Sequence, residues 1–377
     1  MAHNSNFPNG GPSNTASSSA AEPRKVPISM LLSNEEQTAM GILPASHWQQ
    51  QFTDDETDDD VVPRARTASL TESIFQYRHI HGRTYHSDLG NAESWEPNDE
   101  RHIEAMEIAH HAYMLTMGHR LYCAPLDKNK VRKVLDIGTG TGLWAIDFAD
   151  EFPEADVVGT DVTPIQPSWV PANVRFELDD CNQEWTWPAN TFDFIHARML
   201  VGVIEDWYLF HRQAFRTCKP GGYVETFVVC STMKCDDGTL KEDSAMLQWG
   251  KVFNEGGRRF GRTFEVYDND LQRKAMAAAG FVDIEYRDYY IPIGVWHPEK
   301  EAAEIGLWWK LAVEADIEGY LNYIFNIVVG WSPEETKSYA DRCKKEWNNP
   351  NFHGYAVARS AWGRKPGYVP GNNERTR

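Results

Sequence analysis

Glycine and threonine alternate over residues 138–142, directly after a short apolar run, and this spacing suits the binding of a nucleotide-type ligand. Val134 and Leu135 are typical of a buried parallel strand, and a helical pattern starts at Leu143. In such a strand–turn–helix unit the glycines let the backbone approach a ligand, and the helix N-terminus presents free N–H groups to an anion. The residues expected to surround the ligand are Gly138, Thr139, Gly140 and Gly142.

The spacing of these glycines also separates two classes of cofactor. A dinucleotide fingerprint needs glycine at its first, third and sixth positions, but Leu143 occupies the sixth position here. Asp136 stands just before the first glycine, where a carboxylate requires a cationic or strongly donating partner. The ammonium of S-adenosylmethionine meets that requirement, whereas a nicotinamide dinucleotide has no such group near the turn. We therefore predict S-adenosylmethionine, with a nicotinamide-dependent oxidoreductase as a minor alternative.

Acidic residues stand at the ends of the next two predicted strands. The strand over residues 156–160 ends at Asp161, which is placed to bind the two ribose hydroxyls of an adenosine. The strand over residues 174–178 is followed by Asp179 and Asp180. A carboxylate at that point can accept a hydrogen bond from the exocyclic amine of adenine. We favour Asp180 for this contact and keep Asp179 as the alternate.

Two further polar residues follow the strand predicted over residues 192–195. The ends of central strands in an open α/β sheet face the ligand crevice, so His196 and Arg198 are candidate site residues. We expect Arg198 to contact the cofactor. For His196 we favour a positioning role and keep a catalytic role as the alternative.

These segments belong to a chain that alternates strand and helix at least four times, which predicts a doubly wound α/β sheet. A helix over residues 207–218 ends at the stop signal Lys219–Gly222. A strand over 281–293 precedes an all-helical block over 299–347, in which Ser332 caps the last helix. The other expected elements are a helix that starts at Asn98 or Asp99, helices over 143–152 and 271–280, and strands over 223–229 and 354–362.

The first part of the chain has a different composition. Asn, Ser, Gly and Pro dominate its start, an acidic run covers residues 54–60, and few large apolar residues offset the entropy of ordering. This predicts a disordered tail over residues 1–70, with an interaction or phosphorylation segment as the alternative. The further divisions are a helical lid segment (71–130), a cofactor-binding core (131–298), a helical insertion (299–350), the final strand of the core (351–367) and a frayed end (368–377).

The overall composition excludes some functions and locations. A net charge of −18 argues against electrostatic binding of nucleic acid, which needs a basic face. The six cysteines contain no C-x-x-C pair, which favours free thiols in a reducing compartment. No metal site is expected, and His110 and His111 are interpreted as packing residues. The N-terminus has no signal-type apolar region, and the stretch over 305–331 is too polar to span a membrane, so we expect a cytoplasmic or nuclear protein.

Several of these segments together resemble a known family over residues 75–367. The glycine-rich stretch, the strand-end acids and the segment Phe192–Arg198 look like a class I S-adenosylmethionine-dependent methyltransferase. More narrowly, the chain resembles the fungal LaeA-like methyltransferases. The segments that carry this second likeness are Gly82–His86, Trp144–Asp147, Pro164–Pro167 and Asp236–Leu240, in this order along the chain.

The resemblance implies a seven-stranded sheet whose last strand is antiparallel, with the helical block inserted before that strand. It implies that Asp136 and the three glycines surround the methionine part of the cofactor. Val162 would join Asp161 at the ribose, and the N–H of Cys181 would join Asp180 at the adenine. Relatives include regulators of fungal secondary metabolism and development, some found with velvet-type proteins in the nucleus, and enzymes that methylate small molecules.

Methyl transfer from a sulfonium is an in-line displacement in which the protein mainly orients the nucleophile and excludes water. A general base is needed only when the nucleophile arrives protonated, and the candidates are His196, Tyr85, His86 and Glu225. For Tyr85 and His86, in a segment predicted to be a loop, we favour a lid over the cofactor, with a structural turn as the rival. The chain is thus expected to methylate a small molecule or a protein. The alternative is a regulatory scaffold that acts through velvet-type partners.

Overall fold

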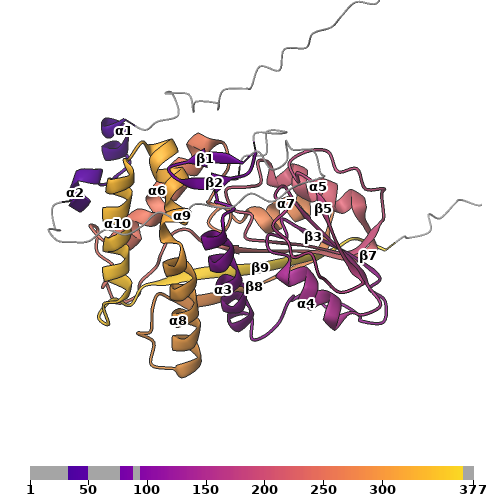
Figure 1. Cartoon of the computed structure of the whole chain (residues 1–377). Coiled ribbons are helices and arrows are strands. Elements are labelled where there is room, and N and C mark those ends of the chain that lie inside the picture. The colour runs from indigo at the N-terminus through magenta and orange to yellow at the C-terminus, as the bar shows by residue number, and fades with distance from the viewer. Residues whose placement is uncertain (1–32, 50–76, 88–93, 368–377) are drawn as a thin grey trace, which may run out of the picture.

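The computed structural model describes residues 33–49, 77–87 and 94–367, and a seven-stranded sheet forms its centre (Figure 1). The strands run in the spatial order β5-β4-β3-β6-β7-β9-β8. Neighbours from β5 to β7 are parallel, and β9 lies antiparallel between β7 and β8, which confirms the predicted fold class. The strand bounds are β3 (Lys133–Ile137), β4 (Asp156–Asp161), β5 (Val174–Leu178), β6 (Phe192–Arg198), β7 (Cys218–Val229), β8 (Val282–Pro292) and β9 (Tyr355–Arg364).

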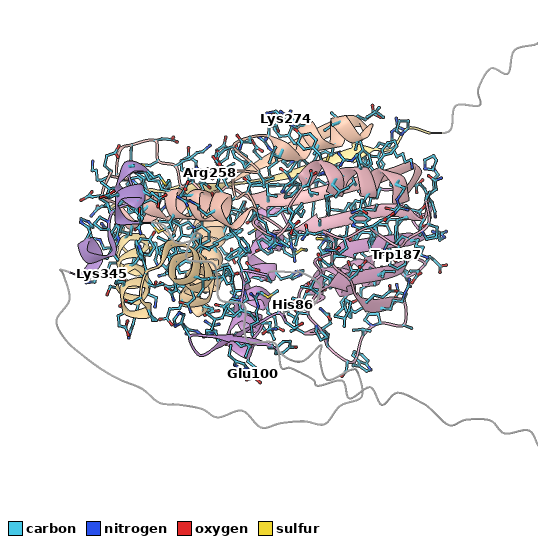
Figure 2. The ribbon with its side chains drawn as sticks, turned by 90° about the horizontal axis from the view of Figure 1, so that it is seen from above. His86, Glu100, Trp187, Arg258, Lys274 and Lys345 are labelled. Atoms are coloured by element: carbon cyan, nitrogen blue, oxygen red, sulfur yellow. The ribbon has the colours of Figure 1, made fainter. Side chains whose placement is uncertain are left out.

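Helices cover both faces of this sheet because the central strands bury alternate side chains on opposite sides. Val134 of β3 packs in the cluster that contains α4 (Leu143–Glu151), whereas Leu135 packs in the cluster that contains α5 (Trp207–Thr217) and α7 (Leu271–Ala279). Charged side chains of the helices, such as Lys274 of α7, lie at the periphery (Figure 2). The carboxyl ends of the parallel strands lie outside these two packed faces and line a cavity.

Beside the sheet lies a helical lobe (Figure 1). The predicted block before the last strand consists of α8 (Lys300–Ala315), α9 (Ile317–Asn322), a π-helical turn η3 (Tyr323–Val329) and α10 (Pro333–Trp347). Ser332 and Glu335 form a capping box at the start of α10, as the sequence predicted. The lobe also contains α6 (Ala245–Phe260), which the sequence analysis missed and which packs against η3. No helix among the described residues is long and apolar enough to cross a membrane.

The prediction of a disordered tail is wrong for residues 33–49. This segment forms α1 (Asn34–Ala39) and α2 (Ala45–Gln49), which rest on the lobe (Figure 1). Ile42 and Trp48 are buried, and the Trp48 ring meets Tyr339 of α10 edge to face at 5.1 Å between centroids. Burial of these two apolar side chains offsets the entropy of ordering the segment. The prediction failed because it was based on the polar composition of the whole region. The rest of the predicted tail and the C-terminal end after residue 367 lie outside the described residues.

Two segments that were predicted from the sequence as a loop and as a helix stop signal contain strands. The segment with Tyr85 and His86 contains a hairpin of β1 (Arg78–Ile80) and β2 (Arg83–Tyr85). Its turn residues His81 and Gly82 both have positive φ angles, 48° and 75°, which match the right-handed twist of a two-residue hairpin. The predicted stop signal after residue 218 lies within β7, where the pairing with β6 changes register.

The helix α3 (Glu100–Thr116) starts at Asp99, whose side chain accepts a hydrogen bond from the His102 N–H. Asp99 was one of two caps proposed from the sequence. The helix packs mainly on α8 and also touches α4, so it bridges the lobe and the sheet. One side of α3, with Met106, Ala109 and Tyr113, lines the same cavity as the carboxyl ends of the parallel strands.

Candidate functional site

A cavity of about 300 Å³ begins at the carboxyl ends of β3, β4, β5 and β6 and continues under the helical lobe. We divide it into two halves by the character of the lining. The polar half is lined by the glycine-rich turn and the strand-end acids, and by His196 and Arg198. The apolar half is lined mainly by side chains of the lobe and of the last strands, among them Met233, Met246, Trp249, Phe253, Ile291 and Val313.

The glycine-rich turn has the conformation that only glycine adopts easily. Gly138, Gly140 and Gly142 have φ angles of 63°, 56° and 82°. A Cβ added at Gly140 would lie 2.6 Å from the Met106 Cε of α3, and one at Gly142 would lie 2.3 Å from the Phe176 ring. Gly138, Thr139 and Gly140 line the cavity, whereas Gly142 supports the turn against Phe176 from behind.

Asp136 is buried beneath this turn and is held by two donors. Its Oδ2 accepts a hydrogen bond from the Thr139 hydroxyl at 2.7 Å, and its Oδ1 lies 2.7 Å from Nδ1 of His196. The His196 ring is stacked on Trp144, with 3.8 Å between centroids and 5° between planes. These contacts fix the carboxylate where the ammonium of an amino acid would approach. His196 both contacts Asp136 and lines the cavity, so its positioning role stays a prediction.

Asp161 stands at the end of β4 and is bonded to the backbone of the turn. Its Oδ2 accepts from the Gly140 N–H at 2.8 Å, and its Oδ1 accepts from the Thr163 N–H at 3.0 Å. Burial raises the pKa of Asp161, and these backbone hydrogen bonds oppose the rise. Asp161 and Val162 both line the polar half, as a site for ribose hydroxyls requires.

The segment after β5 brings Asp179, Asp180 and Cys181 to the same half of the cavity. Both carboxylate oxygens of Asp180 already accept bonds within the segment, from the Asn182 N–H at 3.0 Å and the Gln183 amide at 3.2 Å. Asp179 lies beside it, and burial raises its pKa. Both acids are within the lining, so the choice between them as adenine acceptor stays a prediction. Burial also raises the pKa of the Cys181 thiol, which keeps it neutral.

Arg198 at the end of β6 offers a cation to the polar half. One of its guanidinium nitrogens lies 2.9 Å from Nδ1 of His110, and its charged end lies 4.5 Å above the Tyr113 ring. His110 in turn lies 2.9 Å from Asp147 through its Nε2. No carboxylate of the described residues forms an ion pair with Arg198, and its burial lowers its pKa. Such a cation is suited to the carboxylate of a bound amino acid.

The two neighbouring histidines of α3 have separate surroundings. His110 links Arg198 to Asp147, a role that the sequence analysis did not foresee because it assigned the pair to packing. His111 packs its ring on Trp308 at 4.2 Å between centroids. In the part of the chain that the structure describes, no group of three His, Cys, Asp or Glu side chains could hold a metal ion.

Three residues proposed as a general base do not line the cavity. Tyr85 is fully buried against Tyr323, at 5.9 Å between ring centroids, and burial raises its pKa. His86 is buried just after the same strand, and its carbonyl accepts from Arg78. Glu225 is buried in β7 and accepts hydrogen bonds from the Cys123 N–H, the Ala124 N–H and the Ser360 hydroxyl. The structure therefore replaces the lid and base hypotheses for these side chains with structural roles.

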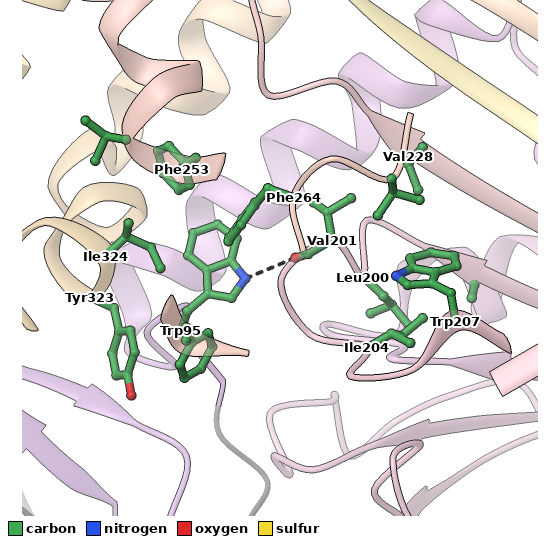
Figure 3. Packing of buried hydrophobic residues seen from close by; sticks show 14 of the residues in the cluster. Trp95, Leu200, Val201, Ile204, Trp207, Val228, Phe253, Phe264, Tyr323 and Ile324 are labelled. Carbon is green, nitrogen blue, oxygen red and sulfur yellow. Dashed lines mark hydrogen bonds between the residues drawn. The ribbon is translucent and has the colours of Figure 1, made fainter. Parts of the chain in front are cut away.

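A stretch that was not predicted from the sequence also lines the cavity. Residues 94–98 precede α3, and Glu96 and Asn98 face the cavity from this segment. Trp95 anchors it, because its indole N–H donates to the Val201 carbonyl at 3.1 Å and its ring meets Phe253 and Phe264 edge to face (Figure 3). The only feature of this stretch that the sequence predicted was the start of the following helix.

Met199, directly after β6, also lines the cavity. Its φ of 61° is a strained angle for a residue with a side chain.

The sequence is similar to those of known methyltransferases. The profile of a family described as "Methyltransferase domain" matches residues 108–286. The chain is 37% identical to methyltransferase pytC of Aspergillus terreus over 286 residues. This match covers 76% of this chain and 87% of that protein. It is 31% identical to the probable methyltransferase tdiE of Emericella nidulans, over 73% of this chain and 86% of that protein. It is 30% identical to the secondary metabolism regulator laeA of Aspergillus flavus, over 76% of each chain.

Proposed function

The chain belongs to the LaeA-like family of S-adenosylmethionine-dependent methyltransferases, and we propose that it methylates an apolar small molecule in the apolar half of its cavity. The cofactor takes the polar half, where Asp136 faces its ammonium, Arg198 its carboxylate and Asp161 its ribose. When bound, the cofactor supplies an activated methyl group. The protein contributes the position of the acceptor and the exclusion of water.

The lining of the apolar half is the observation that carries this proposal. Trp249 and Phe253 of α6, Val313 of α8 and Ile291 of β8 present hydrocarbon and aromatic surface to the cavity. A protein acceptor would bring a backbone with unpaired polar groups, or a charged side chain, against hydrocarbon surface that cannot pair with it. An apolar molecule gains free energy there by leaving water, about 25 cal/mol for each Å² of apolar surface buried. A small acceptor is therefore favoured over a protein side chain.

Calorimetry with S-adenosylhomocysteine tests the cofactor half. We expect micromolar binding by the purified protein and at least tenfold weaker binding by Asp161→Ala, because that carboxylate both holds the turn and meets the ribose. Absence of binding to cofactor-free protein would remove the basis of the proposal.

A probe of the apolar half tests the acceptor. Naphthalene should quench the fluorescence of Trp249 and Trp309, which line the cavity, in protein saturated with S-adenosylhomocysteine. Val313→Trp should lower the affinity for naphthalene at least tenfold by filling the space, while the affinity for S-adenosylhomocysteine stays unchanged. Leu311→Trp is the matched control, because Leu311 lies on the exposed side of the same helix. Equal naphthalene binding by both variants would refute the small-molecule proposal.

A regulatory role in secondary metabolism is the second candidate. One relative is named a secondary metabolism regulator, and β8 forms an edge of the sheet with Tyr286 and Tyr290 exposed. Unprotected edge strands are surfaces on which a partner protein, for example one of velvet type, can add a strand. A deletion strain that carries Asp136→Ala tests this. Regulation that survives the loss of cofactor binding would support a scaffold, and regulation that is lost with it would support catalysis.

A further inference from the structure

The segment before α3 brings two polar side chains into the cavity without protein partners for their polar atoms. Asn98 is only 8% exposed, and neither its amide nitrogen nor its amide oxygen forms a hydrogen bond with the described residues. Glu96 also lines the cavity, and Nε2 of His102 lies 4.0 Å from its carboxylate. A buried amide without a partner destabilises the fold, because it has lost its hydrogen bonds to water. A bound molecule that pairs with Asn98 would remove this cost.

A buried histidine stands behind Glu96. His102 has no exposed surface, and its Nδ1 lies 2.9 Å from Oδ2 of Asp316. Asp316 is also fully buried and accepts hydrogen bonds from Arg83 at 2.9 and 2.7 Å, so its oxygens act as acceptors. Nδ1 of His102 therefore donates to Asp316, and the other ring nitrogen, Nε2, lies toward Glu96. The row Asp316–His102–Glu96 ends in the cavity with a carboxylate.

The groups around Glu96 raise its affinity for a proton. Burial is the main cause that raises the pKa of Glu96, and the carboxylates of Asp161 and Asp316 add to the rise, while His102 opposes it. Tyr113 and Tyr320 face Glu96 from α3 and α9, and burial raises the pKa of both phenols, so neither supplies a charge at neutral pH. A carboxylate in such surroundings binds a proton more readily than one in water.

We propose that Glu96 is the general base of the methyl transfer and that the acceptor is an apolar molecule with a hydroxyl group, which Asn98 orients. This rests on the proposed function. The acceptor oxygen bonds to the methyl carbon as the bond from that carbon to sulfur breaks. The electron pair of the broken bond stays on sulfur, and the hydroxyl proton passes to Glu96.

The nature of the base decides between acceptor classes. A neutral amine attacks with its own lone pair and needs no base before transfer, whereas a hydroxyl is a weak nucleophile until its proton is taken. The carboxylate of Glu96, with His102 and Asp316 behind it, is therefore needed only when the nucleophile is a hydroxyl that must lose its proton. His102 and Asp316 are positioning residues, because neither lines the cavity.

Binding of two matched probes tests the assignment without turnover. In protein saturated with S-adenosylhomocysteine, 1-naphthol should bind at least tenfold more tightly than naphthalene, because Glu96 accepts its hydroxyl hydrogen bond. Glu96→Ala should remove this preference, whereas Met233→Ala should weaken both probes alike. Equal affinities of the wild-type protein for the two probes, or an unchanged preference in Glu96→Ala, would overturn the assignment.

Transfer of a labelled methyl group to 1-naphthol provides the second readout. Glu96→Gln should slow the reaction about 100-fold and leave the affinity for S-adenosylhomocysteine unchanged. His102→Asn should retain part of the rate with a shifted pH profile, an effect that a merely structural role would not produce. A tenfold loss of S-adenosylhomocysteine affinity in Glu96→Gln would assign this residue to the cofactor instead, and lack of transfer by the wild type would also reject the base. If the wild type does not bind S-adenosylhomocysteine at all, the proposed function itself fails.

Discussion

Nδ1 of His196 lies 2.7 Å from Oδ1 of Asp136, and both side chains are almost fully buried. The pair joins the ends of β6 and β3, which are neighbours in the sheet. Because the Thr139 hydroxyl donates to the other oxygen of Asp136, the carboxylate has one fixed orientation toward the polar half of the cavity. This arrangement supports the proposal that His196 positions Asp136 and does not act as the base of the reaction.

Replacement of His196 should therefore weaken cofactor binding. His196→Ala removes the hydrogen bond to Asp136 and the stacking surface on Trp144, and we expect about tenfold lower affinity for S-adenosylhomocysteine by calorimetry. His196→Asn keeps a donor and should recover part of the affinity. A rate that falls in His196→Ala while the affinity is unchanged would instead indicate proton transfer by this ring.

Arg198 should distinguish ligands by their carboxylate. Arg198→Ala is expected to lower the affinity for S-adenosylhomocysteine about 10- to 100-fold, the range of a charge-assisted hydrogen bond. It should leave the affinity for the decarboxylated analogue nearly unchanged. Arg175→Ala is the control, because Arg175 of β5 forms ion pairs with Asp156 and Glu177 and does not line the cavity. Equal losses for both ligands would place Arg198 elsewhere on the cofactor.

The sheet and the polar half of the cavity were predictable because they follow from local sequence patterns. Buried parallel strands read as apolar runs, and an acid such as Asp161 that follows such a run must lie at the carboxyl edge. In contrast, α6 was missed because Gly256 and Gly257 interrupt its pattern. In the fold these glycines permit close packing, since a Cβ would lie 2.5 Å from Ile324 or 2.4 Å from Phe264. The two glycines are explained only by these contacts, which join residues that are distant in the sequence.

Dependence on tertiary contacts also explains why the general base was assigned to other residues from the sequence. Tyr85 and His86 were chosen because a polar aromatic loop suggests chemistry, but pairing of β1 with β2 turns both side chains into buried supports. Glu96 was not predicted as a site residue because it belongs to no motif and lies between a tryptophan and a helix start. Its neighbours Asp161 and Asp316 lie 65 and 220 residues further along the chain (161 − 96 and 316 − 96). No local pattern relates residues so far apart.

The segment over residues 33–49 should contribute to stability. Trp48→Ala removes a ring that is only 3% exposed and packs on Tyr339, so we expect a loss of about 3–5 kcal/mol in the free energy of unfolding. Urea unfolding followed by circular dichroism measures this. Trp169→Ala is the matched control, because that ring is 88% exposed and its removal should change stability by less than about 0.5 kcal/mol. Similar small effects of both substitutions would show that residues 33–49 are not part of the cooperative fold.

Glu96 should carry a measurable stability cost that depends on pH. Its pKa is raised in the folded protein, mainly by burial, so folding disfavours the ionised form. Below the pKa of the unfolded chain the carboxyl is neutral in both states and costs nothing. As the pH rises through the unfolded-state pKa to the folded-state pKa, the wild-type protein loses stability relative to Glu96→Gln, by about 1.4 kcal/mol for each unit by which the pKa is raised.

We therefore expect Glu96→Gln to be more stable than the wild type at pH 7 and equal to it near pH 4, as measured by urea unfolding of the cofactor-free protein. Glu104→Gln, at an exposed position of α3, should behave like the wild type at both pH values. A Glu96→Gln variant that is less stable at pH 7 would mean that the carboxylate is held by favourable contacts. Greater stability together with a slower reaction would instead identify Glu96 as a group kept for chemistry at the expense of the fold, as is common for active-site residues.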